Sequence, residues 1–402
     1  MFSAAVSPPR IATLILITSL ATLSLNMFLP SLSNMADTFQ ADYGLVSLSV
    51  AGYLGMTGLL QVIMGPLSDR FGRRPVLLAG LFIFIAASLG CVLATDIWTF
   101  LAFRMMQAAI ISGAALSPAV VRDMVPEREA ASLLGYISMA MAIAPMLAPM
   151  FGGVLDELFG WRASFVAFAV MGVMVFTLCW TDLGETNLTP SETFSRQFQA
   201  YPELFRSRRF WGYSLCMAFS TGSFYAFLAG APLVTRALFD MAPGVLGFYM
   251  GTITTGFFLG SFLSGRYAKR FGLTTLMIIG RSVACTSLVV GLVLFMGGYV
   301  HEISLFGATS LVGLGNGLTM PSSAAGAMSV RPQLAGSASG LAGALTVGGG
   351  AILTFMAGIL VTEENNAIAL LVIMLLSAAA GLAAALYVVC VDRSEQPELA
   401  AP

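Results

Sequence analysis

Twelve long apolar segments, separated by short polar connections, dominate this 402-residue sequence. A helix needs roughly 20 apolar residues to cross the hydrocarbon core of a bilayer, so twelve spans with short loops account for this length. Charged residues make up only 10% of the chain, whereas soluble domains carry about 25%. The sequence therefore predicts an all-α integral membrane protein. The apolar segments fall near residues 11–32, 44–64, 76–95, 98–121, 131–155, 161–181, 210–234, 244–264, 275–299, 303–326, 336–361 and 367–390.

The basic residues are distributed unevenly among the predicted loops. If the amino terminus is cytoplasmic, nearly all of them fall in cytoplasmic loops, and only Arg162 and Arg236 lie in outer loops. Because loops rich in Lys and Arg stay in the cytoplasm, both termini are predicted to be cytoplasmic.

An internal repeat divides the chain into two halves. Gly65–Gly72 (GPLSDRFG) aligns with Gly265–Gly272 (GRYAKRFG) at an offset of 200 residues. The longest polar interval, residues 182–209, falls between the sixth and seventh spans. We therefore expect a six-helix bundle over residues 1–181, a cytoplasmic linker over 182–209, and a second six-helix bundle over 210–402. Duplicated halves of this kind enclose a central binding site in many secondary transporters.

The connection after the second span is dense in charge and glycine, which predicts a short polar turn at the membrane surface. Its sequence resembles the loop between helices 2 and 3 of the major facilitator superfamily, G-x-L-x-D-R-x-G-R-R/K. The resemblance implies the twelve-helix fold of that superfamily, and it implies that this turn is a conformational latch between the halves. The matching residues are Gly65, Leu67, Asp69, Arg70, Gly72, Arg73 and Arg74.

Arg104 is the only charge expected well inside a predicted span. A charge at that depth is costly and normally faces a cavity or a partner. Phe103–Gln107 resembles a motif of the same superfamily, in which a glutamine follows an arginine by three positions. The alternative is an arginine that satisfies backbone carbonyls and only holds helices together. The residues predicted to line a substrate and proton cavity are Asn26, Tyr53, Arg104, Gln107, Tyr136, Phe224 and Asn316.

The fifth span contains two prolines and two adjacent glycines. Prolines bend a helix, and glycines let a neighbouring helix approach closely. The segment Ala144–Gly153 resembles the antiporter signature G-P-x-x-G-G, which is associated with drug exporters, although Ala148 replaces the first glycine. The alternative is a packing kink without a transport role. The predicted antiporter motif comprises Pro145, Pro149, Gly152 and Gly153.

The end of the first span, Asn26–Pro30, resembles the D-x-Y-L-P segment of the Bcr/CflA group of drug:proton antiporters. That group has an aspartate where this chain has Asn26, and an amide cannot titrate. Three accounts remain open. In the first, Asp37 or Asp123 serves as the proton site. In the second, the transporter is uncoupled or altered. In the third, Asp37 reaches the cavity because the first span ends elsewhere.

The resemblance implies export of small amphipathic drugs, of the chloramphenicol, florfenicol or bicyclomycin type, across a bacterial inner membrane in exchange for protons. The alternatives are a carrier for a sugar or another small metabolite, and a membrane sensor that transports nothing. We expect a monomer that is not an enzyme, has no cofactor and binds no nucleic acid. The five cysteines have no metal-binding spacing, so no metal site is expected.

Overall fold

The structure is a computed structural model that describes residues 9–124, 127–187, 201–331, 335–362, 364 and 366–395. Within these ranges all regular structure is helical, and eleven helical spans are long and apolar enough to cross a membrane. A further 33-residue helix, α7 (Glu127–Phe159), occupies the position of the predicted fifth span. The expected all-helical membrane fold is confirmed.

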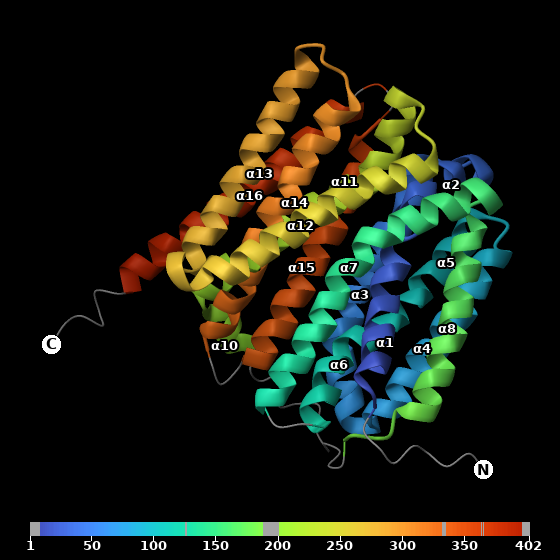
Figure 1. Ribbon diagram of the computed structural model, residues 1–402, viewed down its shortest axis with the longest axis vertical. Coiled ribbons are helices and arrows are strands. Elements are labelled where there is room, and N and C mark those ends of the chain that lie inside the picture. The colour runs from blue at the N-terminus through green and yellow to red at the C-terminus, as the bar shows by residue number, and fades with distance from the viewer. Residues whose placement is uncertain are drawn as a thin grey trace. The chain divides into compact units, whose positions relative to one another are not determined.

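The chain divides into two compact units, of which the first comprises Met1–Ser195 and Met241–Phe248. In Figure 1 the helices of this unit, coloured blue to green, lie side by side. Besides α7, its elements are α1 (Ile11–Asn26), η1 (Leu29–Ser31), α2 (Leu32–Phe39), α3 (Tyr43–Phe71), α4 (Arg73–Leu93), α5 (Ile97–Gln107), η2 (Ala108–Ile110), α6 (Ile111–Met124) and α8 (Arg162–Asp182).

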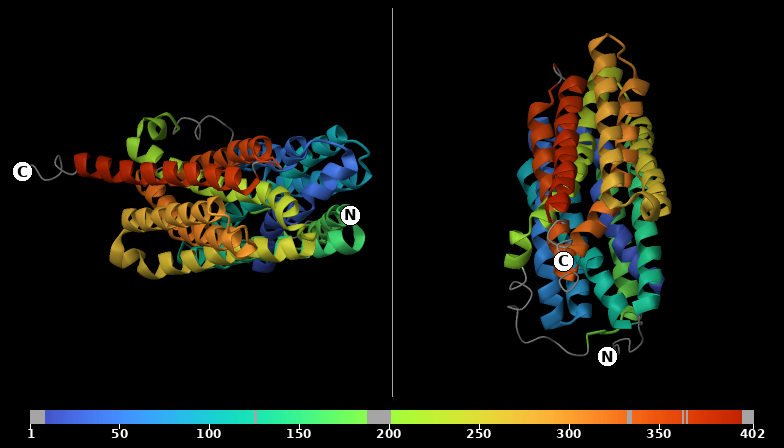
Figure 2. Two further views of the ribbon diagram at one scale, coloured as in Figure 1. Left: turned by 90° about the horizontal axis from the view of Figure 1, so that it is seen from above. Right: turned by 90° about the vertical axis from the view of Figure 1, so that its left-hand side faces the viewer.

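The second unit comprises Arg196–Asp240 and Tyr249–Pro402. Its long helices also pack side by side, and those coloured orange to red are seen from two further directions in Figure 2. The helices from this part of the chain are α10 (Tyr201–Arg206), α11 (Arg208–Phe239), α12 (Pro243–Phe271), α13 (Leu273–Met296), α14 (Glu302–Ser329), α15 (Ala335–Leu360) and α16 (Asn366–Glu395).

Large apolar side chains are exposed along the helices, as expected where lipid is the solvent. Phe82 on α4 is 65% exposed and Met174 on α8 is 59% exposed. Several buried hydroxyl groups bond to carbonyls of their own helix, as those of Thr18, Ser88 and Thr235 do (2.7–2.8 Å). In a bilayer each polar group needs such an internal partner because no water reaches the hydrocarbon core.

The predicted length of the polar turn between the second and third spans is wrong, because the predicted spans leave residues 65–75 outside the helices. Helix α3 continues to Phe71, and Arg73 already begins α4, so Gly72 alone connects the two helices. Its backbone angles are φ 95° and ψ 155°, a conformation that glycine adopts readily and other residues rarely do. Gly272 makes the same single-residue connection between α12 and α13, with φ 78°. The repeat seen in the sequence is therefore also a repeat of backbone geometry.

The expected boundary between the fifth and sixth spans is also wrong. The predicted spans 131–155 and 161–181 leave Asp156 and Glu157 in the loop between them. In the structure both residues belong to α7, which ends at Phe159. Gly160, with φ 79°, follows, and α8 begins at Arg162. The helix continues through Asp156 because this side chain is buried and bonded to another helix rather than exposed in a loop.

Candidate functional site

Arg104 lies fully buried in the first unit. Its Nε donates to the carbonyl oxygen of Ser49 (3.1 Å), one terminal nitrogen donates to the carbonyl oxygen of Ser24 (2.9 Å), and the other donates to Oε1 of Gln107 (2.7 Å). Each nitrogen of the guanidinium therefore bonds a neutral acceptor. In the part of the chain that the structure describes, no carboxylate forms an ion pair with it.

Aromatic rings and a second set of polar groups surround this guanidinium. Its central carbon lies 4.4 Å from the ring centre of Phe28 and 4.0 Å from that of Tyr53, distances at which a cation is attracted to a ring face. The Tyr53 hydroxyl lies 2.7 Å from Oγ of Ser24, and Nε2 of Gln107 donates to Oγ of Ser88 (2.7 Å). One network thus joins α1, α3, α4 and α5.

The geometry of Arg104 fits the alternative that the sequence left open, an arginine that holds helices together. Burying a charge without hydrogen bonds is very costly, and here backbone carbonyls and an amide supply them. Tyr53 and Gln107, two other predicted cavity residues, belong to the same network. A cavity role for these residues stays a prediction.

Asn26 lies at the last position of α1 and is buried. Its Nδ2 donates to the carbonyl oxygen of Thr22 (2.8 Å), while its Oδ1 has no hydrogen-bond partner among the described residues. The amide that replaces the aspartate of the Bcr/CflA group is therefore only partly satisfied.

Arg281 contradicts the expectation that Arg104 is the only charge inside a span. It lies on α13 in the second unit and is fully buried. Its Nε donates to the Thr319 hydroxyl (3.1 Å), and a terminal nitrogen donates to Oδ1 of Asn316. The remaining terminal nitrogen has no hydrogen-bond partner within the described ranges. The sequence carried this signal, because Arg281 lies well inside the predicted span 275–299.

The three remaining residues predicted to line the cavity are Asn316, Phe224 and Tyr136, and they lie on three different helices. Asn316 lies on α14 and accepts a hydrogen bond from Arg281. Phe224 lies half-buried on α11 with its ring centre 5.5 Å from that of Tyr225. Tyr136 belongs to α7, but its side chain lies outside the described part of the structure.

The glycines of the α7 motif lie where other backbone segments approach most closely. A Cβ atom at Gly152 would overlap the carbonyl oxygen of Met27, and one at Gly153 would overlap that of Pro243. Pro243 belongs to the residues 241–248 that form part of the first unit. Only glycine fits at either position without moving a backbone segment, and Pro145 and Pro149 lie within the preceding turns of the same helix.

Two predicted latch residues, Asp69 and Arg73, form an ion-pair chain with Asp123, a predicted proton site, at the ends of α3, α4 and α6. A terminal nitrogen of Arg73 lies 2.5 Å from Oδ1 of Asp69, and its Nε lies 3.3 Å from Oδ2 of Asp123. Asp123 also accepts a hydrogen bond from the Thr186 hydroxyl (3.2 Å). The first unit thus gathers one basic and two acidic side chains at one end.

Glu185 caps the beginning of α4, next to this chain of charges. Its carboxylate accepts hydrogen bonds from the backbone N–H groups of Arg73 (2.8 Å) and Arg74 (3.1 Å). A carboxylate is favourable at this position because the first N–H groups of a helix lack partners within the helix. A Cβ atom at Gly72 would overlap this carboxylate, so the cap also requires glycine there. Sequence reasoning did not single out Glu185.

The remaining latch residues lie around the same end of α3. The side chain of Arg74 donates to the carbonyl oxygen of Trp180 (2.9 Å), and the Arg70 guanidinium lies 5.4 Å from the ring centre of Phe71. Gly65 lies within α3. The predicted latch residues are thus neighbours in the first unit, and their role as a latch stays a prediction.

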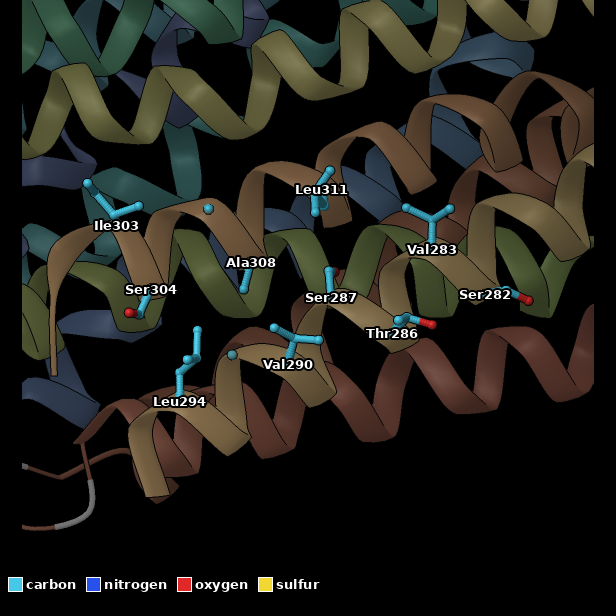
Figure 3. A pocket seen from close by; sticks show the side chains of 12 residues that line it. Ser282, Val283, Thr286, Ser287, Val290, Leu294, Ile303, Ser304, Ala308 and Leu311 are labelled. Carbon is cyan, nitrogen blue, oxygen red and sulfur yellow. The ribbon is translucent and has the colours of Figure 1, made fainter. Parts of the chain in front are cut away.

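A cavity of about 520 Å³ lies in the second unit between α13 and α14. Figure 3 shows that its walls are formed by small and aliphatic side chains, including Ser287, Val290, Ser304 and Ala308. None of the predicted cavity residues lines it. Among the described residues, no group of three His, Cys, Asp or Glu side chains could hold a metal ion.

The Major Facilitator Superfamily model matches residues 14–354. The chain belongs to this superfamily, which consists of transporters rather than enzymes. It is 31% identical over 353 residues to an uncharacterized MFS-type transporter, YdgK, of Bacillus subtilis, covering 85% of this chain and 86% of the relative.

Two other relatives have names that refer to resistance. Multidrug resistance protein D of Escherichia coli is 28% identical, over 86% of this chain and 88% of the relative. A chloramphenicol resistance protein of Pseudomonas aeruginosa is 32% identical, over 60% of this chain and 55% of the relative.

Solved structures share the fold at lower sequence identity. A bacterial homolog of the human lysosomal transporter Spinster, in an inward-facing and occupied conformation, has a TM-score of 0.75 and 16% identity, with 97% of this chain and 98% of that chain covered. A D-xylose-proton symporter has a TM-score of 0.72 and 16% identity, with 94% and 96% covered. These likenesses show that the chain shares the fold of these structures.

The Arg104 network predicts a stability difference between two glutamine substitutions. Gln107→Leu removes the acceptor of one Arg104 nitrogen, and hydrogen bonds to charged groups contribute about 1.5–3 kcal/mol. Gln61→Leu in α3 is the matched control, because Oε1 of Gln61 has no hydrogen-bond partner among the described residues. Thermal unfolding of the purified protein in detergent should show a clear loss of stability for Gln107→Leu only. Equal melting temperatures for the two variants would contradict the network.

Proposed function

We propose that this transporter exports small amphipathic drugs from the bacterial cytoplasm across the inner membrane, by alternating access and in exchange for protons. The observation that carries the proposal is the α7 motif. Gly152 and Gly153 contact neighbouring backbone so closely that no other residue fits, and the segment resembles the signature of drug antiporters. The names of the Escherichia coli and Pseudomonas aeruginosa relatives support the same substrate class.

The proposed orientation places both ends of the first six spans in the cytoplasm. The backbone N–H of Arg10, just before α1, donates to Oδ2 of Asp182 at the end of α8 (2.8 Å). The Thr13 hydroxyl donates to the same carboxylate (2.5 Å). The beginning of the first span and the end of the sixth thus lie together, as an even number of crossings requires.

The polar groups of the predicted cavity favour an apolar substrate over a sugar. A sugar carrier needs several polar side chains that are free to bond hydroxyl groups. Here Arg104 and Gln107 bond each other, and Asn316 bonds Arg281. What remains is the partly satisfied amide of Asn26 and the aromatic side chains of Tyr53, Tyr136 and Phe224. Aromatic side chains suit a site that accepts several amphipathic molecules.

The latch proposal predicts a transport defect without a folding defect. Asp69→Asn removes the negative charge that pairs with Arg73, and the proposed latch between the halves requires that charge. We expect drug efflux to fall to the level of cells without the protein, while the amount of protein in the membrane stays normal. Normal efflux by this variant would refute the latch role.

Drug accumulation in intact cells tests the proposed function itself. Chloramphenicol, florfenicol and bicyclomycin are offered in turn to cells with and without the protein, before and after a proton uncoupler is added. We expect lower accumulation with the protein, and we expect the uncoupler to abolish that difference.

Asn26→Asp is compared in the same assay, since Asn26 replaces the aspartate of the Bcr/CflA group. The native chain should already be active and sensitive to the uncoupler, so the variant should add no coupling. Efflux that occurs only in Asn26→Asp would show that the amide disables the antiporter. Equal accumulation of all three drugs with and without the protein would contradict drug export.

A further inference from the structure

One acidic side chain lies buried among the described residues. Asp156 on α7 is 6% exposed, and the other charged side chains that are buried in the described ranges are Arg104 and Arg281. The two carboxylates predicted as proton sites have different surroundings. Asp37 lies exposed on α2, and Asp123 lies at the surface in an ion pair with Arg73. Asp156 is therefore buried, whereas Asp37 and Asp123 both lie at the surface.

Asp156 is held by an amide rather than by a cation. Nδ2 of Asn34, on α2, donates to its Oδ2 (2.8 Å). The nearest basic residue in the sequence, Arg162, is engaged elsewhere, since its side chain donates to the carbonyl oxygens of Val92 (3.2 Å) and Ala94 (3.1 Å). Within the described part of the chain, Asp156 forms no ion pair.

Few other charges lie near this carboxylate. Helix α1 and η1 contain no charged residue, and α2 contributes only the exposed Asp37. On α7 itself the neighbouring Glu157 is exposed. On α6 and α8 the remaining charges, Arg122, Asp123 and Asp182, lie near the opposite ends of those helices from the connection between α7 and α8.

Asp156 also lies one helical turn from the two motif glycines. Residues three and four positions apart share a helix face, so the carboxylate continues the face on which Gly152 contacts Met27 and Gly153 contacts Pro243. A change of charge at Asp156 therefore acts where α7 packs against the end of α1 and against residues 241–248. Those contacts belong to the motif that resembles the antiporter signature.

We propose that Asp156 is the carboxylate that binds and releases the transported proton. The inference rests on the proposed function, drug export in exchange for protons. The carboxylate takes a proton from the outer side and becomes a neutral acid, and it returns that proton to the cytoplasmic side before the next drug molecule leaves. Burial without a cation disfavours the charged form, whereas the N–H of the Asn34 amide that donates to Oδ2 favours it.

Everted membrane vesicles with an imposed pH gradient test this proposal. Drug accumulation is measured with chloramphenicol, florfenicol and bicyclomycin for the native protein and for Asp156→Asn. Glu157→Gln is the matched control, because it removes the adjacent carboxylate, which is exposed. Asp156→Asn should lose accumulation driven by the gradient but keep drug exchange without a gradient, and Glu157→Gln should keep both.

A second variant separates proton binding from a merely structural role. Asn34→Ala removes the donor that favours the charged carboxylate. The pH at which gradient-driven transport is half-maximal should therefore move to a higher value. A structural role predicts a lower rate at an unchanged pH midpoint, and that result would overturn the inference even if Asp156→Asn failed to fold.

The outcomes distinguish this inference from the function on which it rests. If the native protein moves none of the three drugs, the proposed function fails. If it moves a drug without regard to the gradient, proton coupling fails, and with it the role of Asp156. Coupled transport that survives in Asp156→Asn, or that is lost in Asp37→Asn instead, overturns the inference alone.

Discussion

The Arg104 guanidinium must be satisfied in a part of the molecule that water does not reach, and the first unit is built around that requirement. Its three nitrogens bond two backbone carbonyls and one amide, supplied by α1, α3 and α5. Gln107 extends the network to Ser88 on α4. Four helices are thereby held together without using a carboxylate.

The second unit bonds its buried arginine, Arg281, through two side chains and leaves one nitrogen without a partner among the described residues. At the repeat offset of 200 residues, Arg104 corresponds to Ser304 and Arg281 corresponds to Leu81, so the two arginines occupy different positions of the repeat. What the halves share is the glycine connection, with positive φ at Gly72 and Gly272. Both halves thus reverse the chain at a glycine of positive φ, while their buried arginines lie on helices at different places in the order of each half.

Most of the fold follows from the sequence, because apolar length and the distribution of arginines are local signals. Local sequence patterns did not predict the ends of helices that depend on contacts between residues far apart in the sequence. The charges around Asp69 indicated a loop, yet the helix continues until Gly72 alone can reverse the chain. The charges at Asp156 indicated a connection, but Asn34, far away in sequence, bonds this side chain inside the bundle. No local pattern shows that Glu185 caps α4, because the contact depends on how the linker returns to that helix.

In this account the two buried arginines hold helices together, and Asp156 is the buried group that exchanges a proton. The role of Asp156 is tested most directly by measuring whether a proton is released when the drug binds. The purified protein is mixed with each of the three drugs in weakly buffered detergent solution that contains a pH-sensitive dye. The account predicts that the native protein and Asp37→Asn release a proton when the drug binds, and that Asp156→Asn binds the drug without release. Equal release by Asp156→Asn and the native protein would contradict it.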